Sequence, residues 1–309
     1  MTLKRVVIVG GGVGGLATAL ALKESEYELF IVERDPPPPD IAPEQAFEQW
    51  PREGVPQFRH AHILLSRIQT NLRDHHPELL QQLMAAGLYL STVEEILPAS
   101  HYHGIVPEPG DDDLLHLWGR RATFEYVVRR YVERMPNVHF VHDTRVVGIV
   151  AEPLGRALML RGVELQARDD SRSQLLADIV VDASGVRSKF PEWLEARGVQ
   201  CEDESHASGF VYACRHYHLN DPADSPPREH GGGNYDYLGY ATFYAEHGHY
   251  ALTLACPEDE AELCDLIRRP EGFEALCDQL PVLRRWMRAS TATTKVLGSG
   301  KFQNRWRRF

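Results

Sequence analysis

The sequence has little of what marks several protein classes. Its 309 residues include only 5 cysteines, and none of these forms a C-x-x-C pair. An odd cysteine count without metal-ligand spacing indicates free thiols in a reducing compartment and excludes a disulfide scaffold. Basic residues are outnumbered, with 33 Lys and Arg against 44 Asp and Glu and a formal net charge of −11. Because no basic field is available to hold phosphates along a strand, we expect no nucleic-acid partner.

Long apolar runs are also scarce. Only residues 6–22 form an uncharged, mostly apolar stretch, and Lys4 and Arg5 precede it as in a signal peptide. Glycines interrupt this stretch in a regular pattern, which favours a folded element over a leader. No other stretch is long and apolar enough to span a bilayer. We therefore expect a cytoplasmic protein without a membrane partner.

The first thirty residues predict a β-α-β unit. Residues 6–9 form a β-branched run typical of a buried strand, residues 16–23 are good helix formers, and residues 29–32 form a second apolar run. The unit is completed in about thirty residues, as in the dinucleotide-binding half of a doubly wound fold. The chain therefore begins with an α/β fold.

A glycine turn, Gly10-x-Gly12-x-x-Gly15, joins the first strand to the helix. Gly10 permits the tight turn, Gly12 lets backbone N–H groups approach a pyrophosphate, and Gly15 lets the helix pack closely on the sheet. The helix N-terminus adds positive potential for the phosphates. Glu33, 23 residues after Gly10, can accept hydrogen bonds from a ribose diol. The pattern predicts a dinucleotide site and leaves NAD and FAD open.

Further elements are expected along the rest of the chain. Apolar periodicity predicts helices at three places, and β-branched or alternating runs predict strands at four others. We expect helix over 62–87 with a break at Pro77, over 122–135 and within 258–290, further strands of the first sheet at 138–150 and 179–181, and antiparallel strands at 209–219 and 238–256.

Three segments, residues 54–62, 119–125 and 176–185, resemble flavoprotein monooxygenases of the para-hydroxybenzoate hydroxylase type. The resemblance is closer to a bacterial branch of FAD-dependent oxidoreductases or hydroxylases. It runs through nearly the whole chain and includes residues 240–243 and the tail 304–309. It implies an enzyme and an oxidoreductase, with FAD as its cofactor.

The resemblance also implies which residues hold FAD. The glycine turn and Glu33 match the residues that bind the ADP half, Arg121 matches an arginine near the phosphates, and the strand at Val146 presents backbone atoms to the adenine. The implied cofactor-binding residues are Gly10, Gly12, Gly15, Glu33, Arg34, Arg121, Val146, Asp182 and Gly185.

The chain departs from this family at two motifs. The usual Ala-Asp-Gly motif reads Ala183-Ser184-Gly185, which resembles the reductase and halogenase side of the superfamily. The family also has a later Gly-Asp-Ala segment that holds the flavin ring, and this sequence contains none. We therefore expect a chain truncated before the part of the site that grips the ring. The W-x-W-x-I-P string of a flavin halogenase is absent as well.

Two residues are candidates for binding substrate. The resemblance places the segment of His60 beside the flavin, and Arg215 stands between Tyr212 and Tyr217 as a candidate ligand for an anionic or phenolic substrate. Histidines also occur in His-x-His pairs, which share a strand face and could bind a metal ion. We expect solvated or hydrogen-bonded histidines rather than a metal site. The pairs are 60/62, 101/103, 216/218 and 247/249.

The predicted fold is α/β, with a Rossmann-type FAD-binding domain and an inserted antiparallel-sheet substrate domain. We expect the FAD-binding domain to be discontinuous, because its motifs lie on both sides of the inserted segments. The predicted ranges are 1–87 and 118–200 for the FAD-binding domain, 88–117 and 201–290 for the substrate domain, and 291–309 for a return toward the FAD-binding domain.

The predicted function is FAD-dependent monooxygenation of an aromatic or polyketide-like small molecule with NAD(P)H and O2. Because the chain has a single dinucleotide fingerprint, NAD(P)H is expected to visit only transiently. The cofactor carries such chemistry, so no catalytic side chain is assigned. Two alternatives stay open. Ser184 favours an FAD-dependent reductase or dehydrogenase of an isoprenoid-like substrate, and the missing Gly-Asp-Ala segment favours a non-catalytic nucleotide-binding remnant.

Overall fold

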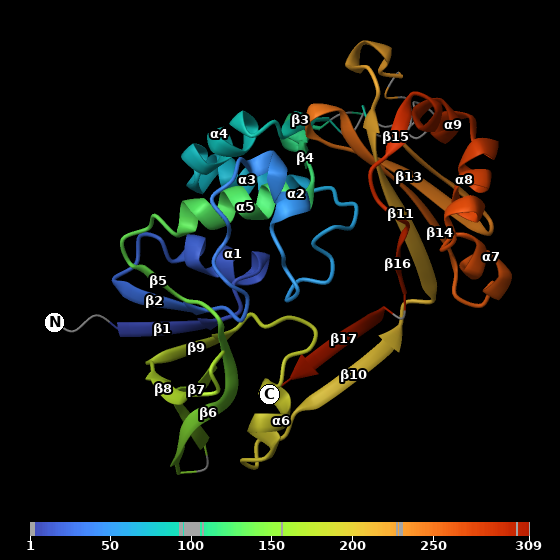
Figure 1. Cartoon of the computed structure of the whole chain (residues 1–309). Helices are drawn as coiled ribbons and strands as arrows, with labels where there is room; N and C mark the ends of the chain where they lie inside the picture. Colours follow the sequence, from blue (N-terminus) through green and yellow to red (C-terminus); the bar gives the residue numbers. More distant parts are fainter. Residues whose placement is uncertain are drawn as a thin grey trace. The chain divides into compact units, whose positions relative to one another are not determined.

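The structure is a computed structural model that describes residues 4–92, 95, 106, 108–155, 157–226, 228, 231–300 and 302–308. The chain divides into two compact units (Figure 1). Unit 1 comprises Met1–Phe58, Glu125–Glu204 and Arg305–Phe309, and unit 2 comprises Arg59–Phe124 and Ser205–Asn304.

Unit 1 is built on a four-stranded parallel sheet with the order β5-β2-β1-β9. The strands are β1 (Lys4–Val9), β2 (Tyr27–Val32), β5 (Val138–Val141) and β9 (Ile179–Asp182), and α1 (Val13–Ala21) connects β1 to β2. This confirms the predicted β-α-β unit and the Rossmann-type fold. The strand order reverses beside β1, and ligands of open α/β sheets bind at such a switch point.

The prediction that residues 138–150 continue the parallel sheet is wrong for its second half. After β5, Asp143 adopts φ 50° and the chain turns into a separate antiparallel sheet. Aspartate is one of the few residues that adopt positive φ readily, so this break interrupts an otherwise apolar run. The sheet consists of β6 (Thr144–Leu154), β7 (Ala157–Ala167) and β8 (Arg172–Leu176).

The antiparallel sheet packs against the parallel sheet of unit 1. Val7 and Val9 of β1 share a buried core with Ile149 of β6 and with Val163 and Leu165 of β7. Figure 1 shows α1 above the parallel sheet and β6–β8 below it. Because strand side chains alternate between faces, β1 is buried from both sides, and its position is fixed tightly.

Three further helices contribute to unit 1. They are α2 (Ala46–Gln49), α5 (Arg121–Val132), whose first turn belongs to unit 2, and α6 (Phe190–Glu195). The predicted amphipathic helix over 122–135 is confirmed by α5, because the residues expected on its apolar face are buried: Phe124, Val127, Val128, Tyr131 and Met135.

Unit 2 contains an antiparallel sheet with the order β12-β13-β14-β11-β15, and β16 pairs with β11. The predicted strands 209–219 and 238–256 are confirmed, and the second is divided by a short 3₁₀ turn at Glu246–Gly248. The strands are β11 (Phe210–Leu219), β12 (Gly232–Tyr235), β13 (Leu238–Tyr244), β14 (His249–Pro257), β15 (Ser290–Ala292) and β16 (Leu297–Ser299).

Helices of unit 2 pack on one face of this sheet. Phe273 of α8 and Leu283 of α9 are fully buried in one core with Tyr217 of β11 and Leu252 of β14. The helical prediction for 258–290 is confirmed by α7 (Ala261–Leu266), α8 (Pro270–Gln279) and α9 (Pro281–Arg288). The predicted helix over 62–87 is confirmed with its break at Pro77, as α3 (Ser66–His75) and α4 (Pro77–Ala85).

The compact units divide the chain differently from the predicted domains. Helices α3 and α4, which we expected in the FAD-binding part, lie in unit 2. They are tied there because Leu64 forms a β-bridge with Leu117, and β3 (Tyr89–Ser91) pairs with β4 (His116–Trp118). Residues 93–94, 96–105 and 107 of the predicted segment 88–117 lie outside the described residues.

The tail is divided between the two units. Residues 291–304 belong to unit 2, and residues 305–309 belong to unit 1. In unit 1, Arg305 and Arg307 form ion pairs with Asp203. These residues lie on β17 (Gln303–Arg308) and β10 (Glu202–Ala207), which pair in a two-stranded sheet.

A buried ion pair anchors the β13–β14 turn within unit 2. The carboxylate of Glu246 accepts hydrogen bonds from Arg120 N at 2.9 Å, Arg120 Nε at 2.8 Å and Thr123 Oγ1 at 2.5 Å. The side chains of Arg120 and Glu246 are 3% and 0% exposed. Burial acts to raise the pKa of Glu246, but Arg120 outweighs it and lowers that pKa, so the carboxylate is ionised.

Replacing Glu246 with alanine should strongly destabilise unit 2. We expect Glu246→Ala to lower the free energy of unfolding by about 3–5 kcal/mol, because the buried Arg120 charge loses its principal partner. Urea denaturation followed by tryptophan fluorescence measures this change. The control Asp265→Ala removes an exposed partner of Arg269 on α7 and should leave the midpoint unchanged. Equal midpoints for the two variants would contradict the assigned role of Glu246.

Candidate cofactor and substrate sites

The glycine turn lies at the carboxyl edge of the parallel sheet. Gly10 has φ 106°, and a Cβ built on it would lie 2.5 Å from the carbonyl oxygen of Ala183. A Cβ on Gly15 would lie 1.9 Å from the Gly10 carbonyl oxygen. Gly12 differs, because a Cβ there would meet only Val55, at 3.9 Å. The first and third glycines are required by packing, whereas the second borders open space.

Open space at Gly12 coincides with the exposed N-terminus of α1. Gly12 is the N-cap residue, and no side chain caps the first turn of this nine-residue helix. The N–H groups of that turn can therefore donate to an anion, and the helix dipole favours negative charge there. Nearby, Arg129 is 1% exposed, and its Nη1 has no hydrogen-bond partner among the described residues. These features fit the ADP half of a dinucleotide.

Glu33 is held beside the turn in a defined geometry. Its Oε2 accepts hydrogen bonds from Gly11 N at 3.1 Å and Arg52 Nη1 at 2.9 Å, and its Oε1 accepts one from Asp35 N at 3.1 Å. Burial acts to raise the pKa of Glu33, but Arg52 and the hydrogen bonds outweigh it and lower that pKa. A carboxylate has about four acceptor positions. An ionised Glu33 therefore retains one for a ribose hydroxyl.

Arg52 is the centre of a buried charge cluster in unit 1. Its guanidinium forms ion pairs of 2.9 Å with Glu33, Asp35 and Glu125, and its side chain is 1% exposed. Arg52 Nη2 also donates to the carbonyl oxygen of Gly11, at 3.2 Å. Arg52 therefore binds both the carboxylate of Glu33 and the backbone of the glycine turn.

Sequence reasoning missed this cluster because charged residues are ordinarily solvated. Arg52 belongs to a loop without periodicity, so nothing in its surroundings predicts burial. One feature of the sequence did indicate the buried charge cluster. In α5, Glu125 and Arg129 occur four residues apart. Since residues at i and i+4 share a helix face, opposite charges among buried neighbours indicate an internal charge network.

Other predicted cofactor residues lie at the same edge of unit 1. Asp182, at the end of β9, accepts hydrogen bonds from Ser184 N at 3.0 Å and from the Ser188 hydroxyl. Thr144 N, at the start of the strand that contains Val146, donates to the Glu33 carbonyl oxygen at 3.1 Å. Unit 1 thus brings together eight of the nine: Gly10, Gly12, Gly15, Glu33, Arg34, Val146, Asp182 and Gly185.

Arg121 and His60 lie in unit 2. Arg121 Nη1 is 3.2 Å from His62 Nε2, and His62 Nδ1 is 2.8 Å from the His60 carbonyl oxygen. Burial lowers the pKa of His62 to about 4, so its ring is neutral at pH 7. Together with His216, these two histidines line one small cavity. The predicted phosphate role of Arg121 stays a prediction.

Arg215 does not lie with His60. On β11, Cys214 Sγ is 3.8 Å from His60 Nδ1, and His216 faces the same side. Since successive strand residues point to opposite faces, Arg215 points toward the helices. There its Nη1 lies 2.5 Å from Glu274 Oε1 of α8, and its Nε donates to Thr294 O at 2.9 Å. Both sides of its guanidinium are therefore engaged by the protein.

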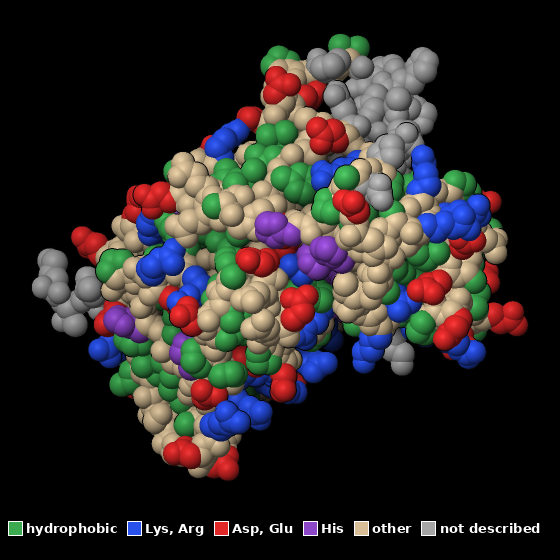
Figure 2. Space-filling model, turned by 45° about the horizontal axis from the view of Figure 1, so that its top comes forward, with side chains coloured by type: hydrophobic (Ala, Val, Ile, Leu, Met, Phe, Trp, Pro, Cys, Tyr) green, Lys and Arg blue, Asp and Glu red, His purple; other side chains and the backbone are tan. Residues whose placement is uncertain are grey.

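The described ranges contain neither a cluster of metal ligands nor a helix able to cross a bilayer. Within them, no group of three His, Cys, Asp or Glu side chains is arranged to hold a metal ion. The pair 101/103 lies outside those ranges. Among the helices described, none has the length and apolar composition needed to cross a bilayer. Figure 2 shows acidic and basic side chains interspersed over the face that it displays.

Comparison with known proteins agrees with this geometry. Residues 5–209 match the family described as an FAD binding domain. The chain is 26% identical over 339 aligned positions to Protein Rv3254 of Mycobacterium tuberculosis, which covers 98% of this chain and 63% of the relative. The chain therefore spans less than two thirds of the length of that curated relative.

Solved structures of flavin enzymes have a similar fold. The myxobacterial halogenase CndH is 16% identical, with a TM-score of 0.66 over 97% of this chain and 64% of the halogenase. PqsL of Pseudomonas aeruginosa, described as a probable FAD-dependent monooxygenase, is 16% identical, with a TM-score of 0.65 over 96% and 72%. The p-nitrophenol 4-monooxygenase PnpA of Pseudomonas putida is 14% identical, with a TM-score of 0.60 over 99% and 68%.

A branched side chain at Gly12 should block the phosphate site without unfolding the protein. We expect Gly12→Val to weaken FAD binding by about 100-fold, or roughly 3 kcal/mol, because the side chain fills the space that the phosphates need. A fluorescence titration with FAD and a thermal melt measure the two effects. Gly15→Ala should instead lower the melting temperature, because its Cβ would overlap the Gly10 carbonyl. A folded Gly12→Val variant with parental affinity would place the phosphates elsewhere.

The protein should become less stable as the pH is lowered, because His216 is buried as a neutral ring. Burial lowers its pKa to about 4, whereas an unfolded histidine titrates near 6.5. Between these values the unfolded state binds the extra proton, so stability decreases as the pH falls from about 6.5 to 4, by about 3 kcal/mol in total. Urea midpoints measured across this range should show a slope that His216→Gln flattens. An unchanged slope in His216→Gln would assign the dependence to other groups.

Proposed function

Because the chain belongs to the family of FAD-binding domains, we propose that it is part of an FAD-dependent monooxygenase. In this proposal the enzyme hydroxylates an aromatic or polyketide-like small molecule with NAD(P)H and O2. The observation that carries it is the glycine turn at the switch point of the parallel sheet, where an uncapped helix N-terminus adjoins an ionised Glu33. This combination suits a pyrophosphate next to a ribose.

The residues of unit 1 would hold the ADP half of the cofactor. Backbone N–H groups at Gly12 and the first turn of α1 would donate to the pyrophosphate, and Glu33 would accept from the adenosine ribose. Arg52 would keep Glu33 ionised and oriented. FAD bound there would supply hydride acceptance from NAD(P)H and oxygen transfer from O2. The protein's task is then to position this cofactor, to exclude water and to orient the substrate.

The similarity of fold supports oxygen transfer. PqsL and PnpA, which share the fold, are named as monooxygenases. The antiparallel sheet of unit 2 would then serve as the substrate-binding part, and the NAD(P)H would act as a transient partner. No side-chain nucleophile is required for this chemistry.

A reductase or dehydrogenase is the second candidate. The reductase hypothesis is favoured by Ser184, because the monooxygenases that this chain resembles usually have aspartate at that position. The backbone N–H of Ser184 donates to Asp182, as does its hydroxyl, so the serine is built into the turn after β9. Such a reductase would transfer hydride to an isoprenoid-like substrate without consuming oxygen.

Oxygen-18 labelling separates these functions. The FAD-loaded protein is supplied with NADH or NADPH, oxygen-18 gas and a panel of phenols and larger aromatics as probes. We expect an accepted substrate to accelerate NAD(P)H oxidation and oxygen uptake, and to leave one oxygen-18 atom in the product. Full turnover under anaerobic conditions, with no oxygen incorporated, would reject the monooxygenase in favour of the reductase.

A further inference from the structure

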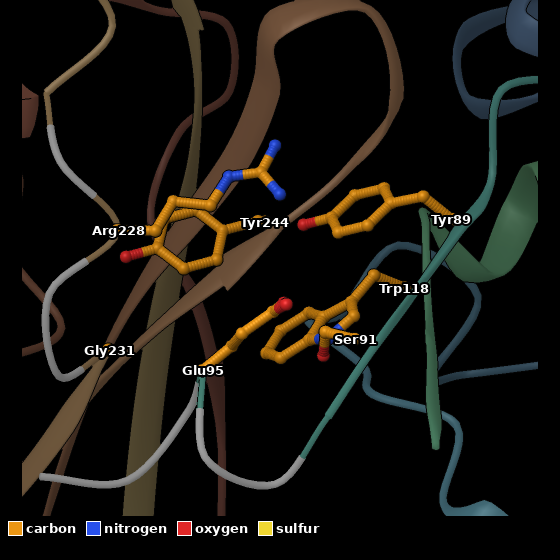
Figure 3. A pocket seen from close by; sticks show the side chains of 7 residues that line it. All are labelled: Tyr89, Ser91, Glu95, Trp118, Arg228, Gly231 and Tyr244. Atoms are coloured by element: carbon orange, nitrogen blue, oxygen red, sulfur yellow. The ribbon is translucent and has the colours of Figure 1, made fainter. Parts of the chain in front are cut away.

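Two features of unit 2 involve none of the predicted site residues. One is a cavity of about 200 Å³ with Tyr89, Trp118 and Tyr244 in its wall (Figure 3). The other is a pair of thiols, Cys256 on β14 and Cys264 on α7, two elements that Figure 1 labels. The second feature brings two oxidisable side chains into direct contact.

The thiol pair is close to the geometry of a disulfide. The two sulfur atoms lie 3.4 Å apart. Since a disulfide joins its sulfur atoms at about 2.05 Å, they need to approach each other by about 1.4 Å. Burial raises the pKa of Cys256 to about 12, so this thiol is protonated and no charge repulsion separates the pair. Both residues are free cysteines in the structure, which therefore represents the reduced state.

Cys264 lies on a helix that has few buried contacts. The helix α7 has six residues, and Cys264 is the only buried one. Four of the other five are exposed. A helix this short is marginal by itself, and a segment with few buried contacts opens locally at low cost. Opening of α7 would bring Cys264 to solvent, whereas Cys256 would stay in the sheet, where it pairs with Val211 of β11.

We propose that Cys256 and Cys264 form a reversible disulfide when hydrogen peroxide is present, and that Cys264 reacts first. The peroxide is small enough to reach a pair whose members are 3% and 5% exposed. In a reducing compartment such a disulfide is transient, as in redox-sensing proteins. The proposal is independent of the proposed function, because it requires neither FAD nor a substrate.

The reaction has two steps. In the first, the thiolate of Cys264 attacks one oxygen of hydrogen peroxide, so that an S–O bond forms, the O–O bond breaks, and the other oxygen takes a proton and leaves as water. In the second, the sulfur of Cys256 attacks the sulfenic sulfur of Cys264, so that the S–S bond forms and the S–O bond breaks. The hydroxyl leaves with the thiol proton of Cys256 as a second water. Two thiols lose two electrons, and one peroxide is reduced to two waters.

The disulfide would change how freely α7 moves. It would join the helix covalently to β14 and so suppress the opening that exposes Cys264. We therefore expect the amides of α7 to exchange hydrogen at least about tenfold more slowly in the oxidised protein than in the reduced protein. Treatment with dithiothreitol should restore the faster exchange, because it reduces the disulfide.

Peptide mapping of the unaltered chain tests the proposal directly. Reduced protein is treated with hydrogen peroxide at pH 7, denatured, blocked with N-ethylmaleimide and cut by a protease specific for glutamate. Glu258, Glu260 and Glu262 lie between the two cysteines, so the cleavage separates Cys256 from Cys264 unless a disulfide joins them. We expect two joined peptides that are about 2 Da lighter than the sum of their reduced forms and that dithiothreitol releases.

Three variants test the order of the steps. Cys256→Ser removes the second thiol, so Cys264 should stop at a sulfenic acid, which dimedone traps. Cys264→Ser should leave Cys256 unoxidised at the same dose, because Cys256 stays buried. The matched control Cys277→Ser alters a fully buried thiol of α8 and should retain the joined peptides. The mapping of the unaltered chain decides the proposal even if a variant fails to fold.

Several results would overturn the proposal. One is full blocking of Cys256 and Cys264 by N-ethylmaleimide at a peroxide dose that oxidises Cys201, which is less buried. Another is oxidation of Cys264 to a sulfinic acid with no joined peptides. Linkage between two copies of the chain, or equal hydrogen exchange of α7 in the oxidised and reduced protein, would also contradict it. Dimedone labelling of Cys256 in Cys264→Ser would reject the assigned order.

Discussion

The ion pair between Arg52 and Glu33 is the interaction on which the cofactor site of unit 1 depends. Burial acts to raise the pKa of Glu33, because desolvation disfavours its charged form, and a neighbouring cation lowers that pKa. Arg52 supplies that cation and also donates to the Gly11 carbonyl, while Glu33 accepts from Gly11 N. One residue pair therefore fixes both the backbone of the glycine turn and the charge of the side chain proposed to bind the ribose.

Such a pair has to be part of a larger network. A buried arginine and a buried carboxylate each lose much solvation energy, and they recover it only when their remaining hydrogen-bonding positions are filled. Asp35 and Glu125 fill those of Arg52, from the loop after β2 and from α5. The network therefore ties three segments that are distant in sequence to the carboxyl edge of the parallel sheet.

The sequence allowed the local parts of this site to be predicted, and not the long-range ones. The convergence of Gly10, Gly12, Gly15 and Glu33 at one edge of the sheet was predictable because strand, turn, helix and strand follow one another within one unit, and their role in binding FAD stays a prediction. Arg52 was missed because its partners come from three segments. Arg215 was predicted to bind substrate, but the two-residue period of β11 places it on the face of Tyr217 and the helices, where Glu274 and Thr294 bind its guanidinium. The parallel sheet was extended too far because a single positive φ at Asp143 redirects the chain.

Competition between nucleotides tests the central claim, that unit 1 binds the ADP half of FAD at the glycine turn and Glu33. The contacts inferred there involve the pyrophosphate and the adenosine ribose, and none involves the flavin ring. ADP should therefore displace FAD from the protein, whereas FMN, which lacks the adenosine, should not, as followed by the recovery of free FAD fluorescence. Displacement by FMN with no effect of ADP would contradict the account and move the binding contacts to the flavin side.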